Sequence, residues 1–500
     1  MSRLELPCAR FALTVCALAL AGCTMIPRYE RPAAPVPDAF PGTIASPANP
    51  ANPANPANAA NAANAASATR TATAQPAAAT QATATTQATT AADIAWTSFF
   101  TEERLKRLIE IALANNRDLR VALLNVEQSR AQYRITRSAV FPEVDASGGF
   151  TRQRALGVTG NQENIAVGVT AYELDLFGRV RSLNRQAVEQ YLATEEAQRA
   201  AQITLVGEVA TQYFALREAE EQLSLARQTL SNVQESFDLN QVMFDAGAIG
   251  ELDLRTAEGQ LQTAKINVLT YQRQRAQADN ALTLLLGQPL PSDLPTPRAF
   301  DDLGLLADIP AGLPSDLVQR RPDILQAEHT LMSANASIGA ARAAFFPKIS
   351  LTGSVGQASS QLSRLFDSTA GVWSFAPQIS LPLFTGGRNT ANLDAAQIAA
   401  RIDVADYEKA IQTAFREVAD ALVANGSYAG EVAEQTRAID AQSRRLELAT
   451  LRYRQGEDTY LNMLLAQQDL YSAQQGRLQA QFNRLSSQIS LYQALGGGWK

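Results

Sequence analysis

The most constraining feature of this 500-residue chain is an internal duplication. Two pairs of matching segments show it: SAVFPEVDASGGF (138–150) with AAFFPKISLTGSV (343–355), and YELDLFGR (172–179) with ISLPLFTGGR (379–388). The copies are offset by about 205 to 209 residues. A repeat of this kind indicates one structural unit used twice, so both halves must share one order of elements. We therefore divide the folded body into two repeats, residues 93–300 and residues 301–500.

Each repeat contains a long helical pattern without proline. The two patterns cover residues 179–246 and 388–455, 68 residues each, and each is followed by a glycine. An α-helix over either would be ~100 Å long. Ten residues of the first have the 4-3 spacing typical of coiled-coil packing: Leu205, Val209, Gln212, Leu216, Ala219, Leu223, Ala226, Leu230, Val233 and Phe237.

Shorter helices accompany each long one. We expect returning helices over residues 251–286 and 460–495, and helices before the strands over 104–140 and 316–345. The returning helices would each be only ~54 Å long. Two shorter helices placed end to end would therefore match one long helix.

Each repeat also has two segments in which apolar and polar residues alternate. Ile349, Leu351 and Val355 alternate with polar residues in the third segment, and Trp373 and Phe375 begin the same pattern in the fourth. Period two over about ten residues is what a tilted transmembrane strand needs. The pattern predicts two hairpins, whose polar loops would cover residues 157–163 and 357–371.

Four strands cannot close a barrel, and open edges cannot face lipid. A four-stranded chain that spans a membrane must therefore share its barrel with copies of itself. Two copies would give eight strands and three would give twelve. Bacterial barrels have an even number of strands and at least eight, so a dimer and a trimer are both possible. If the barrel conducts, a trimer is favoured.

The N-terminus has the form of a targeting signal. Arg3 and Arg10 precede an apolar core at residues 11–20, which is too short to cross a bilayer as a helix. We interpret residues 1–22 as a signal peptide. Leu-Ala-Gly-Cys at residues 20–23 resembles the bacterial lipobox, which implies N-acyl and S-diacylglycerol lipid on Cys23; an ordinary secretory signal is the alternative. Several acyl chains would anchor the protein firmly.

The composition of the chain excludes several kinds of site and partner. Removal of the signal leaves one thiol, so an intramolecular disulfide and a multi-cysteine metal site are excluded. Loss of Arg3, Glu5 and Arg10, together +1, changes the formal net charge from −6 to −7, which disfavours nucleic acid as a partner. Residues 23–38 would be a lipidated segment. Residues 39–92, rich in Pro, Ala, Asn and Thr with one charge, predict a flexible tether.

Longer motifs resemble outer membrane factors of the TolC/OprM type, the lipoprotein channels of tripartite multidrug efflux pumps. The motifs are PRYERP (27–32), NNRDLRVALLNVEQSRAQYRI (115–135), AYELDLFGRVRSLNRQAVEQYLATE (171–195), LPSDLVQRRPDILQAEHTLMSANASIGAARAAFFPKISL (313–351), YEKAIQTAFREVADAL (407–422) and LYQALGGGW (491–499). The resemblance implies a mixed α and β homotrimer. A shared twelve-stranded barrel in the outer membrane would continue as a periplasmic α-helical barrel. It also implies a periplasmic adaptor protein and an inner-membrane RND transporter as partners.

The resemblance assigns adaptor docking to the turns that follow the long helices. Gly247 and Ala248 lie in the first turn, and Gly456 and Glu457 in the second. Glycine suits a tight turn between helices because it tolerates positive φ. Ordinary turn chemistry is the alternative explanation for both glycines.

Close relatives narrow the closed pore with a leucine, an aspartate and an arginine on the helix after the second turn. Leu461 matches the leucine, but Leu465 and Gln468 stand where the aspartate and the arginine are expected. A hydrophobic constriction by Leu461 and Leu465 could replace the charged one, because apolar rings close pores by dewetting. Asp253 and Asp458 are alternative pore-lining groups; solvated surface carboxylates are the simpler interpretation.

No motif in the sequence indicates catalysis. The single histidine, His329, lies on a predicted helix, where a structural role is the more common one. We expect no catalytic residues, no metal site and no cofactor besides the lipid. The predicted function is a passive exit duct for drugs and other small toxic compounds. The alternatives are a channel for proteins (type I) or heavy metals, and a non-conducting lipid-anchored coiled-coil scaffold.

Overall fold

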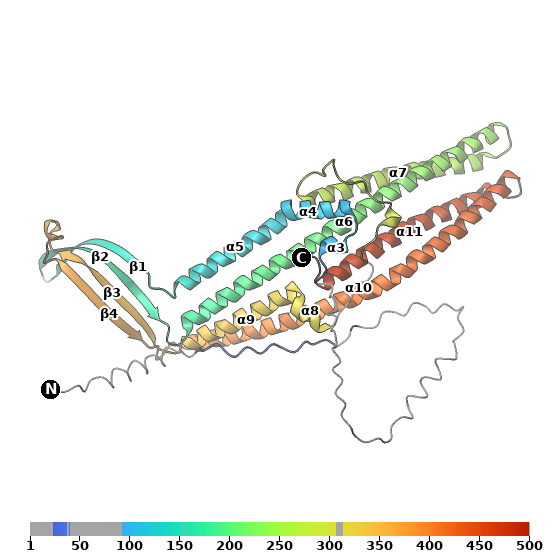
Figure 1. The fold of residues 1–500 in the computed structure, drawn as a ribbon. Coiled ribbons are helices and arrows are strands. Elements are labelled where there is room, and N and C mark those ends of the chain that lie inside the picture. Colours follow the sequence, from blue (N-terminus) through green and yellow to red (C-terminus); the bar gives the residue numbers. More distant parts are fainter. Residues whose placement is uncertain (1–23, 38–39, 41–92, 156, 307–313, 500) are drawn as a thin grey trace, which may run out of the picture.

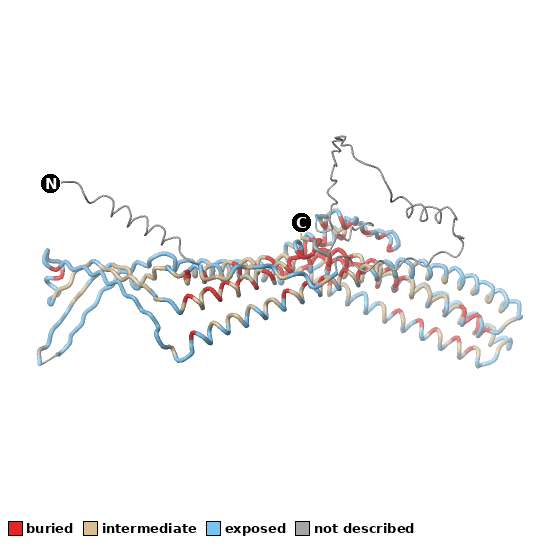
Figure 2. Tube along the Cα trace, turned by 90° about the horizontal axis from the view of Figure 1, so that it is seen from below, coloured by how far each residue is buried: buried red, intermediate tan, exposed pale blue. Residues whose placement is uncertain are grey.

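The computed structural model describes residues 24–37, 40, 93–155, 157–306 and 314–499. The described part is elongated, with a β-sheet at one end and helices that run from the sheet to two distant tips (Figure 1). Within it, every helix is either too short or too polar to cross a membrane. Buried residues gather about halfway along the molecule (Figure 2).

Four antiparallel strands form one sheet in the order of the sequence. They are β1 (Val144–Ala155), β2 (Val158–Leu174), β3 (Lys348–Ser359) and β4 (Gly371–Ser380). The predicted loop over residues 157–163 is wrong, because β1 and β2 stay paired as far as Ala155 and Val158. The second loop is also shorter than predicted. Apolar alternation identifies only the half-buried part of a strand, and both hairpins continue past it.

The strand register places most of the large apolar residues of all four strands on one face, with Val372 of β4 on the other. The aligned pairs are Val144–Val169, Ala146–Val167, Val167–Val355, Val355–Trp373 and Ile349–Ile379. A register shift between Val169 and Tyr172, where Ala171 has a φ of 54°, changes the alternation within β2. This bulge returns Tyr172 to the apolar face that Val169 occupies.

The long helices have the predicted positions. They are α6 (Arg179–Asp245) and α10 (Arg388–Arg454), each 67 residues long. The returning helices α7 (Glu251–Leu286) and α11 (Tyr460–Ala494) complete two hairpins. All four agree with the predicted ranges to within one residue. Most of the predicted coiled-coil positions of α6 are buried, among them Val209 and Ala226.

The helices before the strands are each divided in two, so the prediction of single helices over 104–140 and 316–345 is wrong. The first is α4 (Glu103–Asn115) followed by α5 (Arg117–Ser138). The second is α8 (Pro314–Arg320) followed by α9 (Pro322–Ala343). Asn116 and Arg321, at the two breaks, have extended backbones with ψ of 134° and 123°. Pro322 accounts for the second break, because a proline disfavours helical conformation in the preceding residue.

The predicted end-to-end arrangement of shorter helices is confirmed at both breaks. Asn116 Nδ2 donates to the carbonyl oxygen of Leu285, at the end of α7, over 2.9 Å. Arg321 Nη1 donates to the carbonyl oxygen of Ala494, at the end of α11, over 2.8 Å. In Figure 1, α5 and α7 follow one another along α6, and α9 and α11 do so beside α10. Both repeats therefore have the same arrangement, two shorter helices end to end beside one long helix.

A hydrophobic core surrounds these junctions. It includes the short helices α3 (Trp96–Phe99) and η3 (Phe300–Asp302), and the ring of Phe99 stacks on that of Tyr492 with centroids 4.0 Å apart. The N-terminal segment 24–37 lies along α9, where Tyr29 and Arg31 both bond the buried carboxylate of Glu328. The middle of the molecule is thus its most tightly packed part.

Candidate functional site

The turns predicted to dock a partner lie at the tips of the two helical hairpins. Gly247 has a φ of 71° and Gly456 a φ of 76°. In the first turn the Gly247 N–H donates to Phe244 O and the Ala248 N–H to Met243 O, each over 2.8 Å. This pair of bonds is a Schellman motif, which ends a helix at a residue with positive φ.

The second turn repeats the same geometry. The Gly456 N–H donates to Tyr453 O over 3.0 Å, and the Glu457 N–H donates to Arg452 O over 2.9 Å. Ala248 and Glu457 therefore occupy equivalent positions, and both are exposed. Turn chemistry fully explains the two glycines, while the exposed residues beside them are free of internal packing.

The two hairpins are held together just above the tips. Tyr453 OH, on α10, donates to Asn240 Oδ1 of α6 over 3.2 Å. Tyr460, Met463 and Leu464 of α11 pack with Ala257 of α7 in a small buried cluster. Tyr453 and Tyr460 were not among the predicted site residues, although an aromatic residue on each side of a glycine turn is a sequence signal for such a contact.

Leu461 and Leu465 lie together on the other face of α11. They are 55% and 41% exposed, one helical turn apart, whereas Met463 and Leu464 point into the buried cluster. Gln468 is also exposed, and the next residue, Asp469, forms an ion pair with Arg445 of α10. The structure therefore places both predicted constriction residues on one unpartnered apolar face.

The two candidate carboxylates have different environments. Asp458 Oδ1 accepts from Asn462 Nδ2 over 2.6 Å and from the Thr459 N–H over 2.8 Å, and these bonds, the first more than the second, lower the pKa of Asp458. Its carboxylate thus stabilises the start of α11. Asp253 instead lies near the phenols of Tyr453 and Tyr460. Burial first, and then the charges of Tyr453 and Asp253, raise the pKa of Tyr460 to about 12.

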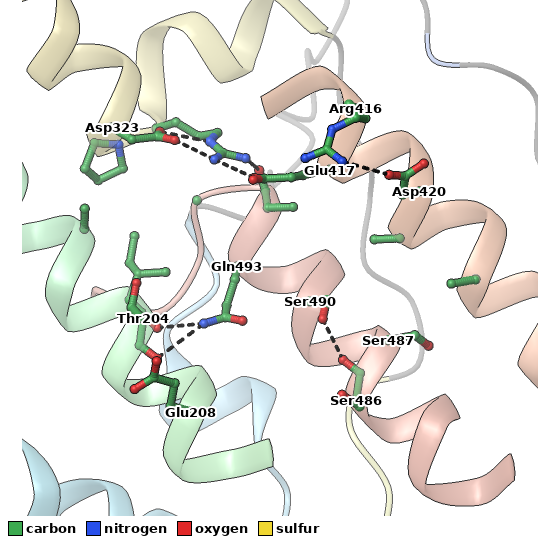
Figure 3. Close-up of a pocket in the computed structure, with 18 of the residues that line it drawn as sticks. Thr204, Glu208, Asp323, Arg416, Glu417, Asp420, Ser486, Ser487, Ser490 and Gln493 are labelled. Atoms are coloured by element: carbon green, nitrogen blue, oxygen red, sulfur yellow. Dashed lines mark hydrogen bonds and ion pairs between the residues drawn. The ribbon is translucent and has the colours of Figure 1, made fainter. Parts of the chain in front are cut away.

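A cavity of about 800 Å³ lies where α9 and α11 meet, between α6 and α10 (Figure 3). Arg321 lines it and bonds Asp323 and Glu417, over 2.6 Å and 2.9 Å. Burial opposes the charge of Arg321, but the two carboxylates outweigh it and raise the pKa of the guanidinium. Gln493 Nε2 donates to Ile203 O over 3.1 Å. Arg321 thus joins α9 to α10, and Gln493 joins α11 to α6, so the cavity is a polar junction between helices.

The lipidation site and the single histidine are the other residues that the sequence singled out. Cys23 lies outside the described residues, as does most of the predicted tether. His329 Nδ1 is 2.7 Å from the buried carboxylate of Glu189, so that the ring joins α9 to α6. Among the described residues, no group of histidine, cysteine, aspartate and glutamate could hold a metal ion.

Comparisons with known proteins agree with this architecture. The family model described as outer membrane efflux protein matches residues 108–288 and 313–497. The chain is 46% identical over 491 residues to the solvent efflux pump outer membrane protein SrpC of Pseudomonas putida, with 96% of this chain and 97% of the relative covered. It is 39% identical over 501 residues to the cation efflux system protein CusC of Escherichia coli O6:H1, covering 99% of each.

Solved structures show the same fold. The open-state outer membrane channel MtrE of Neisseria gonorrhoeae superposes with a TM-score of 0.81 at 38% identity, over 96% of this chain and 99% of that one. The mixed, mostly helical architecture with four strands per chain is therefore confirmed. So is the resemblance that the motifs indicated: this chain belongs to the outer membrane efflux protein family.

Proposed function

We propose that this protein is the outer-membrane channel of a tripartite efflux system, a passive exit duct for drugs and other small toxic compounds. The observation that carries the proposal is the sheet, most of whose large apolar residues share one exposed face. On β2 this face extends from Ile165 to Leu174. Ten residues match the hydrocarbon thickness that a tilted strand crosses. The long helices then reach away from the membrane through the periplasm.

The sheet supports a homotrimer. Its order leaves β1 and β4 as edge strands, each with one unpaired side. Lipid cannot satisfy the N–H and C=O groups of an open edge. If β1 of one copy pairs with β4 of the next, three copies close a twelve-stranded barrel.

The N-terminal segment supports a lipid anchor at Cys23. Ile26, three residues later, lies against Gly339 near the sheet end of α9, so close that a Cβ on Gly339 would be 2.7 Å from Ile26 Cγ1. The segment is thus held where the membrane surface would be. At the opposite end, the exposed tip residues Gly247, Ala248, Gly456 and Glu457 would dock a periplasmic adaptor that links the duct to an RND transporter.

Leu461 and Leu465 form the constriction in this proposal. Conductance in planar bilayers tests both the duct and the gate by comparing the wild type with Leu461→Ser/Leu465→Ser. We expect the wild type to be mostly closed and the double variant to conduct, because serine hydrates a ring that leucine keeps dry. The control is Leu448→Ser/Leu451→Ser on α10, whose leucines are 46% and 48% exposed.

The conductance results distinguish failure of the proposed gate from failure of the proposed duct. Equal conductance of all three proteins would place the gate elsewhere, with Asp253 the next candidate. An absence of any conductance would contradict the duct and favour the anchored scaffold.

Export of metal ions is the second candidate cargo, because CusC is named for cation efflux. The names of relatives at 46% identity refer to solvents and toluene, which favours organic cargo. Survival in toluene and in silver salts, in a host whose own outer channel is deleted, distinguishes the two cargoes.

A further inference from the structure

The β1–β2 hairpin extends beyond the rest of the sheet. Pairing of β2 with β3 ends at Glu163 and Ser359, whereas β1 and β2 stay paired as far as Ala155 and Val158. Residues 151–155 and 158–162 therefore form a two-stranded extension at the end of the sheet away from the helices (Figure 1). In the orientation proposed above, this extension lies outside the cell.

Charge is distributed unevenly between the two faces of the extension. Phe150, 63% exposed, is the last apolar residue of β1 on the apolar face, and the next two positions on that face are Arg152 and Arg154. Their partners across the strand pair are Asn161 and Thr159. The opposite face presents only neutral residues between positions 151 and 162: Thr151, Gln153, Gly160 and Gln162. Both cations thus face the side that the apolar residues assign to lipid.

Neither arginine is neutralised within the described residues. Both are exposed, and neither takes part in an ion pair there. Glu163 is the neighbouring carboxylate on the same face, and it lies opposite Phe150. In a hairpin surrounded only by water, arginines could lie on either face. Because Arg152 and Arg154 both lie on the face that carries the apolar residues, their position points to a ligand on that face.

We propose that Arg152 and Arg154 bind phosphate groups of the anionic amphiphile in the outer leaflet of the membrane. At ~3.3 Å per residue they lie ~7 Å and ~13 Å beyond Phe150 along the strand, at the depth of headgroups rather than acyl chains. The planar guanidinium matches phosphate oxygens bidentately, and anionic headgroups attract basic residues at a membrane surface. The inference rests on the proposed function, because it requires the sheet to lie in the outer membrane.

Native mass spectrometry of protein extracted from vesicles tests the proposal. The vesicles contain phosphatidylcholine alone, with lipid A, or with phosphatidylglycerol. The variant is Arg152→Ser/Arg154→Ser. The control is Arg437→Ser/Arg444→Ser on α10, which loses the same charge at exposed positions that pair with Glu434 and Glu447. We expect wild type and control to retain lipid A, and the variant to retain about 2- to 30-fold less, the range for two exposed charge pairs.

Each outcome of this experiment either supports or contradicts the proposed phosphate site. Retention of phosphatidylglycerol in place of lipid A supports the phosphate site and identifies a phospholipid as its source. Stabilisation of the wild type alone by inorganic phosphate in phosphatidylcholine identifies free phosphate. Equal retention by wild type and variant overturns the proposal. Conductance of Arg152→Ser/Arg154→Ser in the Leu461→Ser/Leu465→Ser background, in phosphatidylcholine bilayers, shows that the arginine variant is folded. Absent conductance of the Leu461→Ser/Leu465→Ser protein itself would instead contradict the duct.

Discussion

At the scale of single residues, the tip turns depend on glycine at Gly247 and Gly456. A Cβ at Gly247 would meet no atom within 4 Å, so only the backbone conformation opposes substitution. We expect Gly247→Ala to lower the free energy of unfolding by about 1–2 kcal/mol, because φ remains at 71°. Gly259→Ala, within α7 and also open, should instead raise it by about 0.5–1 kcal/mol. Urea unfolding followed by circular dichroism measures both, and a neutral Gly247→Ala would contradict the motif.

Tyr460 makes the tips sensitive to alkali. Because its pKa rises from 10.0 to about 12 on folding, the fold favours the neutral phenol. That stability is complete below pH 10 and is lost as the pH rises from 10 to about 12, up to about 2–3 kcal/mol. We expect Tyr460→Phe to flatten this part of the stability curve, measured as urea unfolding at successive pH values. An unchanged slope would show that the phenol ionises equally in both states.

Single residues were predictable where the local backbone decides their role. Gly247 and Gly456 follow from the end of a helical pattern, so they could be identified in advance. The bond between Tyr453 and Asn240 joins residues that are 213 positions apart. No local pattern indicates such a pair, because it depends on how two hairpins pack.

At the scale of elements, Asn116 is the residue on which the α4–α5 junction depends. Its Oδ1 accepts from the Leu119 N–H, and its Nδ2 donates to Leu285 O, each over 2.9 Å. We expect Asn116→Ala to cost about 1–2 kcal/mol of unfolding free energy, and Asn116→Ser to recover part of it by restoring the cap.

The neighbouring residue supplies the control for this prediction. Asn115 Nδ2 bonds only Ile111 O of its own helix over 3.0 Å. Asn115→Ala should therefore change the unfolding free energy by less than about 0.5 kcal/mol in the same urea experiment. If both alanine variants lost equal stability, the junction would not depend on the bond to α7.

Helices with a strong sequence periodicity were predicted well, but the breaks between consecutive helices were not. The returning helix over residues 251–286 has the bounds of α7, because glycines lie at both ends. The break at Asn116 was missed because the residues on either side continue a helical pattern. The break before Pro322 had a signal in the proline itself. The strand ends were missed because polar residues continue a strand as readily as a loop once it leaves the apolar layer.

At the scale of the whole molecule, the two repeats share an architecture but differ where the sheet meets the long helices. In the first repeat Asp175 accepts from the Val180 and Arg181 N–H groups at the start of α6, and Glu173 pairs with Arg179. In the second repeat, Ser380 and Pro382 occupy the equivalent positions. The duplication therefore preserved the order and length of the elements while their connections diverged.

Closure of the barrel is the property that only copies of the chain can supply, and cysteine pairs on the edge strands test it. Ser147 on β1 and Val372, Ser374 and Ala376 on β4 share the polar face of the sheet. We expect Ser147→Cys, combined with a cysteine at one of the three β4 positions, to form disulfides between copies in membranes. A disulfide forms only when Cα atoms are about 4.4–6.8 Å apart, so only one register should react. Because each copy has both edges, denaturing gels should show a ladder that ends at three chains.

The control pairs Ser147→Cys with Trp373→Cys, which lies on the apolar face and points away from the β1 cysteine of a neighbouring copy. It should give no ladder. A ladder that ends at two chains would indicate an eight-stranded barrel, whose interior is filled by side chains and cannot conduct. Absence of crosslinks at all three β4 positions would contradict pairing between β1 and β4. A ladder of three, with no product from the control, would establish that the open edges seen in one chain are the contacts that build the duct.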